Sequence, residues 1–93
     1  MSELAERRRL RKYKEKTLNN LLNNYRIVLT AQKPFHFHCY DKNGHKFVMI
    51  ETDDLSDITK ERLKEIKKGL PDHSIIQIHF YEKYAKKPKL IDI

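Results

Sequence analysis

The segment from residue 35 to residue 52 constrains the fold of this chain most strongly, because it carries a strand pattern on both sides of one turn signal. Asn43-Gly44 is a dipeptide typical of a two-residue β-hairpin turn. Before it, apolar and polar side chains alternate in "FHFHCY", residues 35–40, and after it "KFVMIET", residues 46–52, is rich in strand-forming residues. The segment therefore predicts an antiparallel hairpin in the middle of the chain.

A two-residue turn at Asn43-Gly44 also predicts the register of the hairpin. Counting outward from the turn gives four cross-strand pairs on one face, namely Lys42–His45, Tyr40–Phe47, His38–Met49 and His36–Glu51. The other face is apolar and is expected to be core, and it holds Phe35, Phe37, Cys39, Val48 and Ile50. We expect the helices to cover that apolar face and to leave His36, His38 and Tyr40 more open.

Outside the hairpin, the sequence predicts two helices and two further strands. Residues 3–24 lack glycine and proline, and apolar or small side chains recur there at helical spacing, at Leu10, Tyr13, Thr17, Leu21 and Tyr25. Residues 25–30 and 74–82 are β-branched runs typical of strands, and residues 57–68 form a second helix that Gly69 and Pro71 end. Leu63, Ile66 and Leu70 are expected to face inward.

The predicted class is α+β, in the order α-β-β-β-α-β, with a mainly antiparallel sheet and both helices on one face. The length of 93 residues and an apolar share of 39% predict a single small domain spanning residues 1–93. One cysteine, no apolar run long enough to span a membrane and a charged start without a secretory signal predict a cytoplasmic protein. Cys39, on the apolar face, is expected to be a core residue.

The net charge of +7 is unevenly distributed along the chain. Residues 1–16 hold seven basic and three acidic side chains, residues 51–66 hold three basic and six acidic ones, and residues 67–93 hold six basic and three acidic ones. The first segment is a basic helix start and residues 83–93 are a lysine-rich tail. Such an uneven distribution creates a directional field of the kind that steers polyanions.

The histidines of the hairpin raise a second hypothesis, a metal site formed by His36, His38 and Glu51. Imidazoles two residues apart on a strand point the same way, and a carboxylate opposite completes an open site. The His-Phe-His strand resembles the paired-histidine motif of the HUH endonucleases. That resemblance, carried by three residues, implies a divalent ion on His36 and His38 and a nucleophilic tyrosine at Tyr81 or Tyr84.

The element order is similar to the core of the PD-(D/E)XK nucleases, over about fifty residues. That similarity implies metal ligands at Asp41 and Glu51, whereas the position of the family's lysine is Asp53 in this chain. We expect a solvated strand face rather than a metal site, no cofactor, and no catalysis.

The function favoured by the sequence is non-enzymatic binding of DNA or RNA. The stretches "RRRLRKYKEK" and "YEKYAKKPK" interleave tyrosines with cations, which pair with phosphates, while aromatic rings stack on bases. The predicted binding residues are Arg7, Arg8, Arg9, Arg11, Lys12, Lys16, Lys83, Lys86, Lys87 and Lys89.

The alternative is an inhibitor or adaptor that docks on a nucleic-acid-bound protein machine of the host. In size, the chain is similar to phage anti-CRISPR and anti-restriction proteins, which implies an origin in a virus or a mobile element. A metal-dependent nuclease or nicking enzyme that uses His36, His38 and Glu51 is the third possibility.

Overall fold

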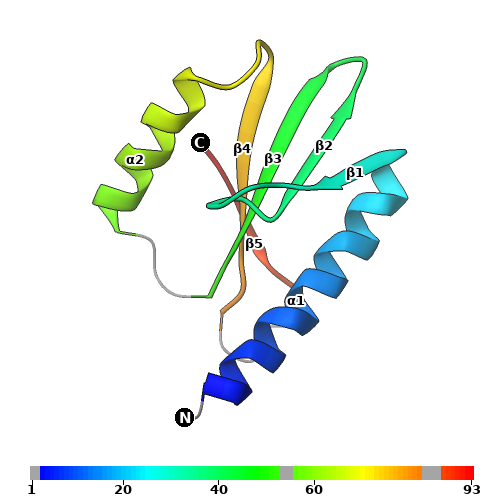
Figure 1. Ribbon diagram of the computed structural model, residues 1–93, viewed down its shortest axis with the longest axis vertical. Helices are drawn as coiled ribbons and strands as arrows, with labels where there is room; N and C mark the ends of the chain where they lie inside the picture. The colour runs from blue at the N-terminus through cyan, green and yellow to red at the C-terminus, as the bar shows by residue number, and fades with distance from the viewer. Residues whose placement is uncertain (1–2, 53–55, 83–86) are drawn as a thin grey trace.

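Five strands form one sheet between two helices, and their order in the sheet follows their order in the chain. The computed structural model describes residues 3–52, 56–82 and 87–93, with the backbone alone for residues 3–7. The elements (Figure 1) are α1 (Glu3–Asn24), β1 (Ile27–Thr30), β2 (Phe37–Asp41), β3 (Gly44–Glu51), α2 (Asp57–Lys68), β4 (Ser74–Phe80) and β5 (Lys89–Asp92).

The sheet is mixed. Strands β3 and β4 are parallel, whereas β1–β2, β2–β3 and β4–β5 are antiparallel. Parallel neighbours need a crossover connection, and α2 supplies it. The predicted α+β class and the mainly antiparallel sheet are confirmed. The chain has one strand more than predicted, because residues 89–92 of the lysine-rich tail pair with β4 as β5.

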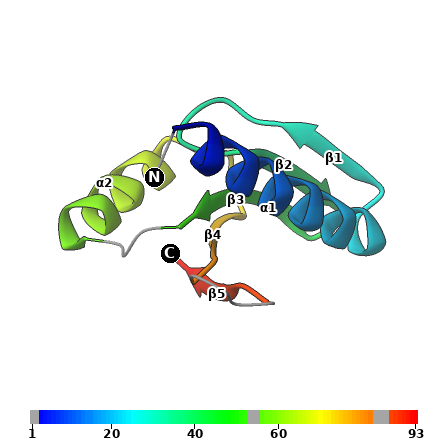
Figure 2. The same cartoon turned by 90° about the horizontal axis from the view of Figure 1, so that it is seen from below.

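The two helices lie on opposite faces of the sheet, so the prediction that both cover one face is wrong. The core on the α1 side consists of Tyr13, Leu21, Phe37, Cys39, Val48, Ile50 and Tyr81. The core on the α2 side consists of Phe35, Phe47, Met49, Leu63, Ile76 and Ile78. Figure 1 shows the strands passing between α2 and α1, and Figure 2 shows β1 and β5 at opposite edges of the sheet.

The β2–β3 hairpin forms, but its register differs by two residues from the predicted one. Asp41 pairs with Gly44 and Tyr40 with His45, so the turn residues are Lys42 and Asn43. The carboxylate of Asp41 accepts a hydrogen bond from the backbone N–H of Asn43 at 2.7 Å, which holds this turn. A shift of two residues keeps every side chain of β2 and β3 on its predicted face, because side chains alternate with a period of two, whereas Phe35, before β2, belongs to the opposite core.

The predicted pairing of His36 with Glu51 is wrong, since the register that pairs Phe37 with Val48 leaves Glu51 beyond His36, whose backbone N–H donates to the carbonyl of Val48. The burial pattern of the hairpin is confirmed in part, because Phe47 and Met49, on the face expected to be more open, are buried in the core on the α2 side. His36 and His38 are half-buried and Tyr40 is exposed. All of the apolar positions expected in the core are buried, namely Phe35, Phe37, Cys39, Val48 and Ile50. Phe35 belongs to the core on the α2 side.

Both helices begin and end at the predicted residues. At the start of α2, the hydroxyl of Ser56 accepts a hydrogen bond from the backbone N–H of Thr59 at 3.1 Å. At its end, the backbone N–H of Gly69 donates to the carbonyl of Ile66 at 3.0 Å. Leu63 is buried and Ile66 is partly buried against the same core, as predicted.

Candidate nucleic-acid interface

Helix α1 is fixed to the sheet along one side, and this orientation decides which of its side chains meet solvent. The ring of Tyr13 stacks on Tyr81 with centroids 4.2 Å apart and planes 13° from parallel. The hydroxyls of Thr17 and Tyr81 are 2.7 Å apart in a buried hydrogen bond. Leu21 completes the buried side of the helix. Tyr81 follows β4 directly, so the helix is tied to the middle of the fold.

The opposite side of α1 carries three exposed cations, Arg8, Lys12 and Lys16. Side chains four residues apart lie above one another on a helix, so the three form a line along its outer surface. We call these three residues the cation row. Among the residues whose side chains the structure describes, none of the three forms an ion pair.

The lysines of α2 differ from the cation row because carboxylates of their own helix neutralise them. Lys64 lies 3.4 Å from Glu61, and Lys68 lies 3.0 Å from Glu65. These exposed i,i+3 pairs add little to stability, but they offset the charge of the two lysines, whereas Arg62 of the same helix is exposed without an ion pair among the described side chains. Within the described residues, the outer side of α1 therefore presents a line of three exposed cations without an ion pair, whereas α2 presents a single such cation, Arg62.

The other predicted binding residues of α1 are less available than the cation row. Arg9 is half-buried, and Arg11 is exposed but lies 3.8 Å from Glu15. The side chain of Arg7 lies outside the described part of the chain. Tyr13 is buried against Tyr81, so the expected stacking of this tyrosine on a base is not available in the folded chain.

The predicted residues of the tail form a second surface. Lys87 and Lys89 are exposed, and Lys89 forms an ion pair with Glu82. Lys83 and Lys86 lie outside the described residues. Strand β5 forms the edge of the sheet beside β4, and Figure 2 shows it apart from α1. The two described tail lysines thus do not extend the cation row.

Two histidines of the hairpin, His38 and His45, contact each other rather than converging with His36 on a metal site. The ring of His38 stacks on Phe47, with centroids 4.2 Å apart and planes 7° from parallel. Its Nε2 lies 2.9 Å from Nδ1 of His45, so one of the two nitrogens donates to the other. Burial, and then the neighbouring His45, lower the pKa of His38. Both influences favour the neutral imidazole, and the hydrogen bond itself requires only that the accepting nitrogen carry no proton.

The other two residues of the hypothetical metal site also have different partners. Nδ1 of His36 accepts a hydrogen bond from the backbone N–H of Ile50 at 3.0 Å. A carboxylate oxygen of Glu51 accepts from the backbone N–H of Thr52 at 2.9 Å. Burial and the charge of Lys14 lower the pKa of His36, and Glu51 opposes them. Within the described residues, no three potential metal ligands converge.

The residues that carry the nuclease resemblances have structural surroundings. Tyr81 is 3% exposed and is stacked and hydrogen-bonded, so its hydroxyl does not face solvent as an attacking nucleophile must. Tyr84 and Asp53 lie outside the described residues. Asp41 stands at the hairpin turn, where its carboxylate accepts the hydrogen bond from Asn43. Cys39 is fully buried, and burial raises the pKa of its thiol, while Lys46 partly offsets the shift.

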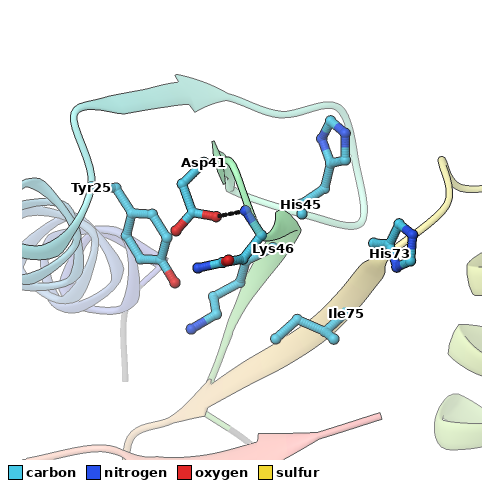
Figure 3. A pocket seen from close by; sticks show the side chains of 8 residues that line it. Tyr25, Asp41, His45, Lys46, His73 and Ile75 are labelled. Atoms are coloured by element: carbon cyan, nitrogen blue, oxygen red, sulfur yellow. Dashed lines mark hydrogen bonds between the residues drawn. The ribbon is translucent and has the colours of Figure 1, made fainter.

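A small pocket lies at the turn end of the sheet, where the sequence predicted no site. It has a volume of about 230 Å³, and Figure 3 shows Tyr25, Asp41 and Lys46 on one side of it and His45 and His73 on the other. The ammonium of Lys46 lies 5.3 Å from the ring centroid of Tyr25. The lining comes from separate segments of the chain, so no local motif marks it. It combines one carboxylate with one ammonium and has no net charge that favours a particular ligand.

Comparisons of the chain with protein-family models, with curated proteins and with solved structures find no match. No helix within the described residues is long and apolar enough to cross a membrane.

Proposed function

We propose that this protein binds nucleic acid without cleaving it, and that the outer side of α1 makes the main contact. The observation that carries the proposal is the cation row, three exposed charges that form no ion pair with a described side chain, on a helix that is fixed by its other side. Neighbouring members of the row are separated by about 6 Å along the helix axis. Long, flexible side chains at that spacing can reach successive phosphates of one strand, and each phosphate neutralised releases condensed counterions.

Two charge-matched variants test this proposal. The row variant carries Arg8→Gln, Lys12→Gln and Lys16→Gln, and the α2 control variant carries Arg62→Gln, Lys64→Gln and Lys68→Gln. Each removes three positive charges from exposed helix positions and keeps a good helix former there. If the cation row is the contact, the row variant should bind random duplex DNA about tenfold or more weakly, and the control should bind nearly as the parent does. Equal losses of affinity in both variants would contradict a specific contact at the cation row and would indicate an effect of net charge alone.

The absence of catalysis is part of the same proposal and has its own test. Incubation with single- and double-stranded DNA in the presence of Mg²⁺ or Mn²⁺ should yield no cleavage products. His36→Ala and His38→Ala should leave nucleic-acid affinity within about twofold of the parent, because neither imidazole belongs to the proposed contact. Metal-dependent cleavage that either substitution abolishes would show instead that the histidine face is an active site.

Exposed apolar residues favour docking on a protein machine as a second candidate function. Ile27 and Leu29 of the edge strand β1 are 40% and 48% exposed. Next to them, a groove of about 460 Å³ opens between α2 and the β1–β2 connection, and Phe35, Ile66 and Leu70 contribute to its walls. If this is the function, Ile27→Gln with Leu29→Gln should abolish capture of a host protein in nuclease-treated extract, and the row variant should retain it.

A further inference from the structure

The C-terminal third of α1 carries four asparagines, Asn19, Asn20, Asn23 and Asn24. Asparagine is a weaker helix former than alanine, leucine or lysine, so each asparagine weakens the helix. Asn24 has a structural partner, because its side-chain amide donates to the backbone carbonyl of Asn20 at 3.0 Å. Asn19 and Asn23 are exposed, and neither side chain hydrogen-bonds to another described residue. The fold therefore does not explain these two amides.

Asn19 and Asn23 lie on the same side of α1 as the cation row. At about 100° per residue, both fall within the sector of the helix that Arg8, Lys12 and Lys16 span, and this sector is away from the buried Thr17. The outer surface thus has two parts in line, three cations followed by two amides. No described element covers it in either view (Figures 1 and 2).

The make-up of this surface favours one class of nucleic acid, a B-form DNA duplex. Its major groove admits an α-helix, whereas the major groove of double-stranded RNA is too narrow and deep for side chains to read. Single strands are held mainly by aromatic rings on which bases stack. Tyr13, the one aromatic residue of α1, is buried on the other side of the helix. The outer surface therefore offers hydrogen-bonding and charged groups but no stacking platform.

We infer that α1 lies in the major groove of duplex DNA, with the cation row on phosphates and with Asn19 and Asn23 reading adenine edges. A side-chain amide offers one acceptor and one donor side by side, which matches the N6 amino group and N7 of adenine. Phosphate contacts fix the register of the protein, and base contacts give it sequence preference. This inference rests on the proposed nucleic-acid binding and adds a duplex substrate and base selectivity to it.

The test is binding-site selection from a pool of duplex DNA with a randomised centre, for the parent and for an Asn19→Ala, Asn23→Ala variant. Alanine is the better helix former, so loss of α1 cannot explain a loss of selectivity. The parent should enrich sites with adenines at fixed spacing, which it prefers over random duplex by roughly ten- to a hundredfold. The double variant should lose that enrichment and keep the parent's affinity for random duplex. A matched control, Asn24→Ala, should select the same sites as the parent.

Several results would overturn the inference, and they separate it from the proposed function. Binding to duplex DNA without any enriched sequence, or enrichment that the double variant retains, contradicts base reading but leaves nucleic-acid binding in place. Tighter binding to single strands or to duplex RNA of the same sequence contradicts the duplex assignment alone. Absence of binding to every DNA and RNA tested contradicts both.

Discussion

Gly44 has a φ of 144°, and a Cβ placed on it would lie 2.2 Å from the backbone carbonyl oxygen of His73. That carbonyl accepts a hydrogen bond from the N–H of His45 at 2.9 Å, so it cannot move away without loss of the bond. Gly44→Ala should lower the free energy of unfolding in urea by about 1–3 kcal/mol or more. Gly69→Ala is the control, because its Cβ meets nothing closer than 3.6 Å. A Gly44 variant as stable as the Gly69 variant would show that the turn relaxes freely.

His79 couples stability to pH. It is 2% exposed, its Nε2 donates to the side-chain carbonyl of Gln77 at 2.9 Å, and burial lowers its pKa to about 4, with Lys46 adding to the shift. The folded chain thus binds fewer protons than the unfolded chain between pH 4 and about 6.5. The contribution of His79 to the free energy of unfolding should be fully present above pH 6.5. It should fall by about 3 kcal/mol as the pH drops toward 4.

Urea unfolding at pH 7 and at pH 4.5 checks this coupling. The lowered pKa values of His36 and His38 act in the same direction, so the parent alone cannot isolate the share of His79. In His79→Gln the fall in stability between the two pH values should be clearly smaller than in the parent. The exposed His73 has a φ of 60°, which asparagine tolerates, so His73→Asn is the control. Its stability should fall between the two pH values by as much as that of the parent. An equal fall in all three proteins would contradict the assignment to His79.

At the scale of the elements, the attachment of α1 depends on a buried polar pair. Tyr81→Phe keeps the stack on Tyr13 but leaves the hydroxyl of Thr17 buried without its partner, which should cost about 1–3 kcal/mol of unfolding free energy. Adding Thr17→Val removes the stranded hydroxyl, so the double variant should be less destabilised than the sum of the single ones. Tyr40→Phe, at an exposed position, should have little effect. Additive losses from Thr17→Val and Tyr81→Phe would mean that the pair contributes nothing as a pair.

The local elements were predictable from the sequence because their signals are local. Ser56 and Gly69 mark the ends of α2, and alternation fixes the faces of the hairpin. The register was not predictable from Asn43-Gly44, because the turn lies one residue earlier, at Lys42-Asn43. Gly44 is instead needed where the backbone carbonyl of His73 packs too close for a Cβ. Asp41, which accepts the hydrogen bond of the turn, was the signal for the earlier position.

The assembly of the elements depends on contacts between distant segments, which local sequence patterns predict less completely. Four consecutive apolar residues at 47–50 are buried in β3, a pattern typical of a strand covered on both faces. That pattern was available in the sequence and predicts helices on opposite sides. Strand β5 has only four residues, and no local pattern in "KLID" predicts its pairing with β4. The sequence predicted the cations of the candidate site. The structure then distinguished the cation row from Arg9, which is half-buried, and from Arg11, which is paired with Glu15.

At the scale of the whole molecule, the arrangement gives the two helices different roles. Helix α2 completes the crossover between the parallel strands and pairs two of its exposed lysines with carboxylates, whereas α1 covers the other face of the sheet and its outer cations form no ion pair with a described side chain. By sequence, α1 carries a net charge of +4, from seven basic and three acidic side chains, out of the total of +7. A polyanion that approaches the molecule should be drawn to the α1 surface, and its binding should weaken as salt screens that field.

The salt dependence of duplex DNA binding tests this account most directly, because its slope counts the phosphates that the protein neutralises. Each phosphate contact contributes about 0.9 to the slope of log K against log salt concentration on duplex DNA. Three contacts at the cation row predict that the row variant flattens the slope of the parent by about 2–3 units, while the α2 control variant keeps it within about half a unit. Circular dichroism should show the same helix content in all three proteins. An unchanged slope in the row variant, or equal flattening in both variants, would contradict the assignment of the nucleic-acid contact to the outer side of α1.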